Sequence, residues 1–166
     1  MGAGAPYGNR NAEKWNSYLN NRNDFNSEKE YHTFIEDNIE LFCEDVINLG
    51  KYINHKSNQP ISRTSFKKPT IERIDLFITG TKGSAIVEIK YPNNYFCEMR
   101  NAISQLLYYS IVADENAIKC DKLIIVSPVY DERIFAIIAK FNLSIELVYL
   151  TKEWHSKIEL EYVCSS

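Results

Sequence analysis

The chain has 166 residues, of which 45% are hydrophobic and 25% charged, the mix of an ordinary globular domain and not of a disordered or fibrous chain. Nineteen Lys and Arg residues against 22 Asp and Glu give a formal net charge of -3, which excludes a uniformly basic coat for indiscriminate nucleic-acid binding but allows a local basic groove. No apolar run approaches the roughly 18 residues of a membrane-spanning helix, so no membrane partner is expected.

The cysteines and the N-terminal segment indicate an intracellular protein. The four cysteines are far apart in the sequence and form no C-x-x-C pair and no zinc-like spacing with histidine, which favours separate thiols in a reducing, cytoplasmic setting. The Gly- and Asn-rich start lacks the apolar segment of a signal peptide. We expect a flexible tail with a short helix near Ala12–Leu19 over residues 1–26, and a single domain over residues 27–166.

The domain is expected to begin with a helix. Ser27 is a candidate N-cap, and Glu30 three residues later completes a capping box. Apolar residues then recur at helical spacing and predict a helix from about Glu28 to Glu44. The polar segment Asn54–Pro60 is expected to be a loop, and Ile61–Phe66 a short strand.

The middle of the chain predicts a β-hairpin, and the second half alternates helices with strands. Ile71–Thr79 and Ser84–Tyr91 are rich in β-branched and aromatic residues and are separated by the loop Gly80–Gly83. The elements expected after the hairpin are a helix over Glu98–Ala113, a strand over Lys122–Ser127, a helix over Asp131–Phe141, and strands over Ser144–Leu150 and Lys157–Val163. This order predicts an α/β domain with a mixed sheet flanked by helices.

The hairpin brings together three residues that could bind a metal or take part in a reaction. Folding it about Gly80–Gly83 places Asp75 opposite Glu88, and directly opposed residues have Cβ atoms about 4.5–5.5 Å apart. Lys90 lies two residues after Glu88 and therefore shares its face. Two carboxylates that would otherwise repel suit a hard divalent cation, Mg²⁺ or Mn²⁺, which can polarise a phosphodiester and lower the pKa of a bound water. The alternative is an exposed hairpin face on which Glu88 and Lys90 form a weak salt bridge.

The helix after the hairpin carries Gln105 and Tyr109, four residues apart on one helical face. With them the chain resembles the PD-(D/E)xK nuclease superfamily: the match is Asp75 within Ile-Asp-Leu, then Glu88-Ile-Lys90, then a Gln-x-x-x-Tyr motif similar to that of RecB-type members. The resemblance covers residues 27 to 126. It departs from the family pattern where a proline often precedes the first acidic residue, because an isoleucine stands there.

The resemblance implies a restriction-endonuclease-like core and a metal-dependent nuclease. In this interpretation Asp75 and Glu88 bind Mg²⁺ or Mn²⁺, Lys90 acts on the attacking water, and Gln105 supports the site. Superfamily members often carry a further metal-binding glutamate on the first helix. Glu28 is favoured for this role, because it lies three and seven residues before the apolar Tyr31 and Ile35 and should share their inward face; the competing residues are Glu30 and Glu36.

Four residues are candidates for nucleic-acid contact. Arg73 lies two residues before Asp75 on the same strand face and could meet a backbone phosphate. Lys67 and Lys68 form a small basic cluster with Arg63 ahead of the hairpin, and Tyr109 either contacts DNA or braces the site. The three basic residues are otherwise solvated surface side chains.

The expected function is therefore hydrolysis of phosphodiester bonds in DNA. Two alternatives stay open: an RNA-processing endonuclease of the same superfamily, and a non-catalytic nucleic-acid or protein-interaction module on the same fold. A homodimer is among the expected assemblies, because cutting two strands would favour a pair of sites.

Overall fold

The computed structural model describes residues 25–61, 72–91, 95–129, 131–152 and, for the backbone alone, 161–164. The helix expected over Ala12–Leu19, most of the strand expected over Ile61–Phe66 and the basic pair Lys67 and Lys68 lie outside these residues. Within them, no helix combines the length and the apolar character that crossing a membrane requires.

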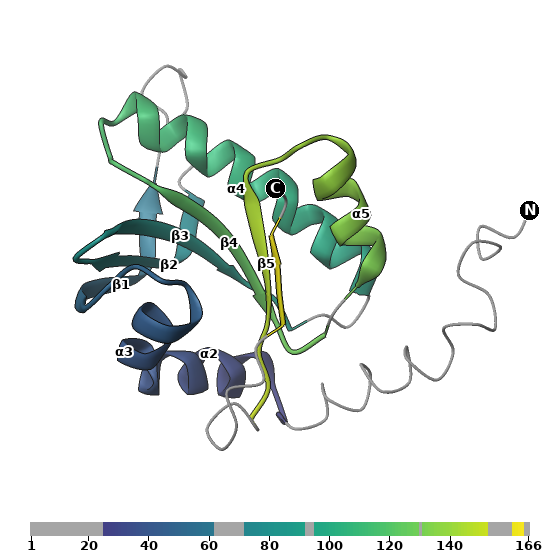
Figure 1. Ribbon diagram of the computed structural model, residues 1–166, viewed down its shortest axis with the longest axis horizontal. Helices are drawn as coiled ribbons and strands as arrows, with labels where there is room; N and C mark the ends of the chain where they lie inside the picture. The colour runs from purple at the N-terminus through teal and green to yellow at the C-terminus, as the bar shows by residue number, and fades with distance from the viewer. Residues whose placement is uncertain (1–24, 62–71, 92–94, 130, 153–160, 165–166) are drawn as a thin grey trace, which may run out of the picture.

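Six strands of the described residues form one mixed sheet in sequential order (Figure 1). Antiparallel pairing joins the first three strands and the last two, and parallel pairing joins the third, fourth and fifth. The strands are β1 Tyr52–Ile61, β2 Glu72–Gly80, β3 Gly83–Ile89, β4 Lys122–Ser127, β5 Ile145–Tyr149 and β6 Glu161–Cys164. The helical segments are α2 Glu28–Asp37, α3 Ile39–Leu41, the π-helical turn η3 Phe42–Val46, α4 Tyr95–Glu115 and α5 Glu132–Lys140. The expected α/β class, with a mixed sheet flanked by helices, is confirmed.

The first helix begins where its cap predicts. The Ser27 hydroxyl accepts a hydrogen bond from the Glu30 backbone N–H at 3.1 Å, which satisfies one of the open donors of the first turn. The helix ends earlier than expected, because the Asn38 side chain donates to the Phe34 carbonyl at 2.7 Å and caps the last turn. A second short helix and η3 then carry the chain on to Val46.

The loop expected over Asn54–Pro60 is wrong, because this segment forms most of β1. It is an edge strand with mostly exposed, polar side chains, so it lacks the apolar alternation that marks a strand in a sequence. Its strand geometry comes from pairing with β2, from Lys56 opposite Phe77 to Ile61 opposite Glu72.

The hairpin register agrees with the prediction. Phe77 pairs with Ile86, and Thr79 pairs with Ser84. Both faces of this hairpin are buried, although only one was expected to be core. Leu76 and Val87 pack toward α2 and η3, whereas Ile86 packs under α4.

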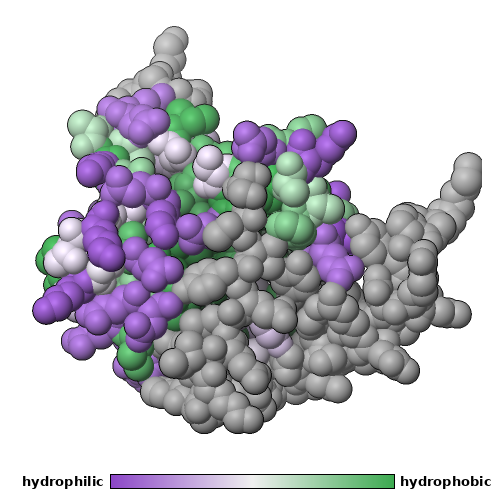
Figure 2. Space-filling view, viewed as in Figure 1, coloured by the Kyte–Doolittle hydropathy of each residue, from purple (hydrophilic) through white to green (hydrophobic). Residues whose placement is uncertain are grey.

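The helices therefore cover the sheet on two sides, with α2 and α3 on one face and α4 and α5 on the other (Figure 1). The connection from β3 to the parallel strand β4 runs through α4, as a parallel pair requires. Hydrophilic residues gather over the side of the molecule formed by the strand turns and α3, at the left of Figure 2. The candidate site lies in the region where α2 and α4 both approach the end of β3.

One buried hydrogen bond joins distant parts of the chain. The Tyr31 hydroxyl in α2 donates to the Leu150 carbonyl beyond β5 at 3.1 Å, and both residues are fully buried. Burial holds the pKa of Tyr31 well above its ordinary value, so the phenol stays neutral and can donate.

Replacing Tyr31 by Phe should lower the free energy of unfolding by about 1–2 kcal/mol, because it leaves a buried carbonyl without its donor. Urea denaturation followed by circular dichroism measures the change. Tyr108→Phe is the matched control, since that hydroxyl makes no hydrogen bond to any residue in the described part of the chain, and it should change stability by less than about 0.5 kcal/mol. Equal effects of the two substitutions would contradict a structural role for the Tyr31 hydroxyl.

Candidate functional site

The site lies at the end of β3, where the first turns of α2 and α4 meet the sheet. β3 runs parallel to β4, and ligand sites of open α/β sheets commonly lie outside the carboxyl ends of such strands. Glu88 is the last residue but one of β3, and Lys90 follows the strand directly. Asp75 comes from the neighbouring strand β2.

The two carboxylates belong to adjacent strands. Leu76 pairs with Val87, so the next step along the ladder sets Asp75 against Glu88. The Asp75 carboxylate accepts a hydrogen bond from the Ile89 backbone N–H at 2.9 Å and is thereby oriented across the hairpin. Glu88 is 2% exposed. The sequence-based pairing of the two carboxylates is consistent with this geometry.

Glu88 is held in an environment that disfavours its charge. Burial raises its pKa from 4.5 to about 7, and the negative charge of Asp75 acts in the same direction. Lys90 opposes the rise, because its ammonium group lies 2.8 Å from one Glu88 oxygen. The other oxygen, Oε2, is buried and has no hydrogen-bond partner among the described residues.

Helix α4 brings an amide and a phenol toward the carboxylates. The Gln105 side-chain oxygen is buried and likewise has no hydrogen-bond partner within the described residues. Tyr109, one turn later, is 3% exposed and donates its hydroxyl to the Arg73 carbonyl at 3.1 Å. Burial raises the pKa of Tyr109 to about 12, and the charges of Glu88 and Asp75 contribute, so this helical face lies near them. Of the two roles expected for Tyr109, the buried hydroxyl favours bracing over direct contact with DNA.

An open pocket of about 430 Å³ is lined by Lys90 and Gln105 of the candidate site. Its walls come from the start of α2, the end of β3 and one face of α4, and its lining residues are Glu28, Lys90, Tyr91, Glu98, Asn101, Ser104 and Gln105. Lys90 both lines the pocket and pairs with the buried Glu88, so it connects the two. Glu98, Asn101 and Ser104 were not predicted as site residues from the sequence. These residues and Gln105 are polar and stand three or four residues apart on α4, and this helical spacing could have indicated a shared polar face.

Glu28 lies at the pocket but not as expected. Its side chain is 67% exposed and its carboxylate is 3.7 Å from His32 Nε2, so it does not share the inward face of Tyr31. Glu28 stands in the first turn of α2, where its side chain lines the open pocket. The two competing glutamates are engaged elsewhere: Glu30 caps the helix start and pairs with a lysine at 3.0 Å, and Glu36 accepts a hydrogen bond from the Ser57 hydroxyl.

The remaining nucleic-acid candidates are only partly described. Arg73 is exposed on β2, and its guanidinium donates to the Asn58 carbonyl of β1 at 3.1 Å. Lys67 and Lys68 lie outside the described residues, so their expected role stays a prediction.

The oxygen atoms gathered at the site are of the kind that bind a divalent cation. Asp75, Glu88 and Gln105 offer carboxylate and amide oxygens, the ligands that Mg²⁺ and Mn²⁺ prefer. Two of these oxygens are buried and accept no hydrogen bond from the part of the chain that the structure describes, a state that costs free energy unless something else satisfies them. A group of three or more His, Cys, Asp or Glu side chains close enough to share a metal is not found within the described residues, so the protein ligands would be two carboxylates with an amide.

Replacing Glu88 by Gln should change how stability depends on pH in EDTA. A folded pKa near 7 against 4.5 means that the folded state keeps a proton that the unfolded state loses, so wild-type stability falls as pH rises from about 4.5 to 7. The substitution removes this loss. At pH 8 the free energy of unfolding of the variant should therefore exceed that of wild type by on the order of 2 kcal/mol, and the variant should melt at or above the wild-type temperature. The difference should shrink toward pH 4.5. Calorimetric melting at several pH values measures it, and a large drop at pH 8 would show that the Glu88–Lys90 ion pair stabilises the fold.

Comparisons with protein-family models, with curated proteins and with solved structures found no match to this chain. The fold class therefore rests on the arrangement of the strands and helices themselves. The function can be inferred only from the chemistry of four residues, Asp75, Glu88, Lys90 and Gln105.

Proposed function

We propose that the chain is a metal-dependent nuclease that hydrolyses phosphodiester bonds in DNA. The observation that carries the proposal is the Glu88 carboxylate, buried beside Asp75, with one oxygen on Lys90 and the other without a hydrogen-bond partner among the described residues. Buried like charges cost stability, and a fold retains them where a site uses them. The order of α2, the hairpin, α4 and β4 is also that of a restriction-endonuclease-like core, which we propose as the fold family.

Each residue then has a distinct task. Asp75 and Glu88 would hold Mg²⁺ or Mn²⁺, which when bound supplies a Lewis acid for the phosphodiester and a lowered pKa for water. Gln105 would add an amide oxygen to the same site from α4. Glu28 stands at the rim of the pocket, where an exposed carboxylate can bind or orient a water.

Lys90 is the residue best placed to act on the reacting groups. Its ammonium group holds Glu88 at 2.8 Å, and the same side chain lines the open pocket. Positive charge at this point would offset the negative charge that develops on the phosphorus oxygens, and the amine could alternatively accept a proton from the attacking water.

The rival function is a non-catalytic binding module, and one observation favours it. The Lys90–Glu88 ion pair is closed at 2.8 Å, as expected of residues that serve only the structure of the hairpin. RNA as the substrate is a further alternative, since the same residues would serve either polymer. We also infer a reducing, cytoplasmic setting, which the free thiols of Cys43, Cys97 and Cys120 support.

Replacing Asp75 by Ala should abolish binding of Mn²⁺, because it removes one of the two carboxylates. Isothermal titration calorimetry at pH 8 compares the variant with wild type, and Asp45→Ala controls for the loss of a remote surface carboxylate. Equal Mn²⁺ binding by wild type and Asp75→Ala would rule out a metal site between the strands.

Replacing Lys90 by Ala should lower the rate of metal-dependent cleavage by about 100-fold or more, if the lysine acts in the chemical step. Gel assays on plasmid, linear duplex, single-stranded DNA and RNA, with Mg²⁺, Mn²⁺ or EDTA, measure this rate. Lys90→Arg separates the two roles: full activity would mean that a positive charge suffices, whereas loss of activity would favour proton transfer. Absence of cleavage by wild type on every substrate would leave the binding module.

A further inference from the structure

A second cluster of side chains lies next to the pocket and has no part in the proposed chemistry. Phe96, in the first turn of α4, is flanked by two arginines. The guanidinium carbon of Arg100 lies 5.1 Å from the ring centroid, and that of Arg133, from the start of α5, lies 4.2 Å from it. We refer to Phe96, Arg100 and Arg133 as the arginine cluster.

The charges of the two arginines are balanced differently. Arg133 makes a two-pronged contact with the buried Asp131, at 2.8 and 3.0 Å, which fixes its orientation and neutralises its charge. Arg100 is exposed, and no carboxylate within the described residues lies at ion-pair distance from it. Its contacts are the Phe96 ring and, at 4.0 Å, the Cys97 sulfur. The cluster therefore carries one positive charge that no carboxylate of the described chain balances.

Packing on the ring also prepares Arg100 for binding. A guanidinium held against an aromatic face has lost part of its freedom before any ligand arrives, and its fork of donors matches the oxygens of a phosphate. An anion contacting Arg100 would thus meet a charged, partly ordered group.

The position of the cluster relates it to the pocket. Glu98, Asn101 and Ser104 line the pocket, and Arg100 lies beside them on the next face of the same helix. A helix with its side chains is roughly 10 Å across, so the path from the pocket over α4 to the cluster is about that length. A strand of nucleic acid leaving the pocket over this helix would reach Arg100 roughly two nucleotides from the scissile bond, beyond a dinucleotide centred on that bond.

We propose that the arginine cluster binds the phosphate backbone of a nucleic acid whose scissile bond lies in the pocket, with Arg100 as the residue in contact. This rests on the proposed function for the identity of the polymer. It assigns backbone contact to a residue other than the sequence-based candidates Arg73, Lys67 and Lys68.

The test compares binding and cleavage in full-length variants. Affinity for fluorescent single-stranded DNA of two, four, eight and sixteen nucleotides is measured in Ca²⁺ at several salt concentrations. Arg100→Ala should weaken binding of the longer oligonucleotides roughly 3- to 10-fold and reduce the slope of log affinity against log salt by about 0.7, the loss of one phosphate contact. Binding of the dinucleotide should be unchanged.

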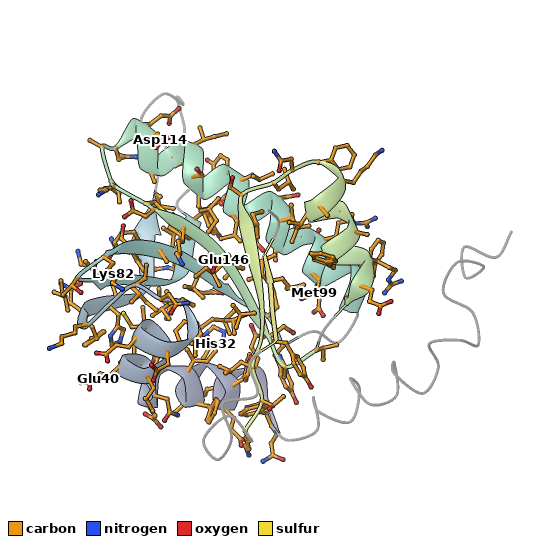
Figure 3. The ribbon with its side chains drawn as sticks, viewed as in Figure 1. His32, Glu40, Lys82, Met99, Asp114 and Glu146 are labelled. Atoms are coloured by element: carbon orange, nitrogen blue, oxygen red, sulfur yellow. The ribbon has the colours of Figure 1, made fainter. Side chains whose placement is uncertain are left out.

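The matched control is Lys82→Ala, which removes the same charge from the turn between β2 and β3. Figure 3 shows Lys82 far from Met99, the neighbour of Arg100 on α4. Lys82→Ala should leave the affinity and the salt slope at wild-type values. Arg100→Lys should fall between wild type and Arg100→Ala, because it keeps the charge and loses the planar fork.

Cleavage distinguishes this proposal from the proposed function. Bis(p-nitrophenyl) phosphate has no polymer backbone, so Arg100→Ala should hydrolyse it with Mn²⁺ at the wild-type rate while cutting long DNA several-fold more slowly at limiting substrate. Affinity loss in Arg100→Ala without any cleavage by wild type would support the cluster and refute the nuclease. Cleavage by wild type with an unchanged affinity and salt slope in Arg100→Ala, or no binding of any oligonucleotide by wild type, would overturn the cluster.

Discussion

The burial of Glu88 beside Asp75 is the constraint on which the site depends. The Glu88 carboxylate is 2% exposed, and burial together with the neighbouring Asp75 raises its pKa, which stands at about 7 with Lys90 in place. Lys90 counteracts this with a direct ion pair and keeps the anionic form accessible. The three residues therefore balance one another, so that small changes in solution conditions or ligands shift the charge of the centre.

The architecture explains why this pair is buried. A β-hairpin with one open face would leave Glu88 in water, where its charge would cost little. Here the crossover from β3 to the parallel strand β4 requires a long connection, and α4 supplies it by lying across the face that carries Glu88. Ile86 and Leu106 pack between strand and helix, so the apolar contacts that stabilise the fold are also those that desolvate the carboxylate.

Turn residues and hydrophobic alternation predicted those strands whose own sequence carries a strand pattern. The loop Gly80–Gly83 and the alternation around it fixed the hairpin register, and the bounds of β4 agree with the prediction. β1 was missed because its residues are polar and exposed, and only the pairing with β2 makes it a strand. Its geometry is a tertiary effect that carries no pattern of its own.

The candidate site shows the same division. Asp75, Glu88 and Lys90 could be grouped from sequence because strand periodicity relates them. The exposure of Glu28 could not, since it depends on what packs around the first turn of α2, which helical spacing does not report. The contact of Arg133 with Phe96 joins two helices through the packing of α5 on α4, and no spacing rule reports such a contact.

The hydrogen bond from Tyr31 to Leu150 constrains the order in which parts of the protein can fold during synthesis. During synthesis the N-terminal helix leaves the ribosome long before β5, yet its buried hydroxyl finds its acceptor only when residue 150 has emerged. Glu28 stands one turn ahead of Tyr31 on that helix and forms part of the pocket wall. A growing chain can therefore form the hairpin with its two carboxylates before the Tyr31 hydroxyl reaches its acceptor, which requires that the chain has been synthesised through β5.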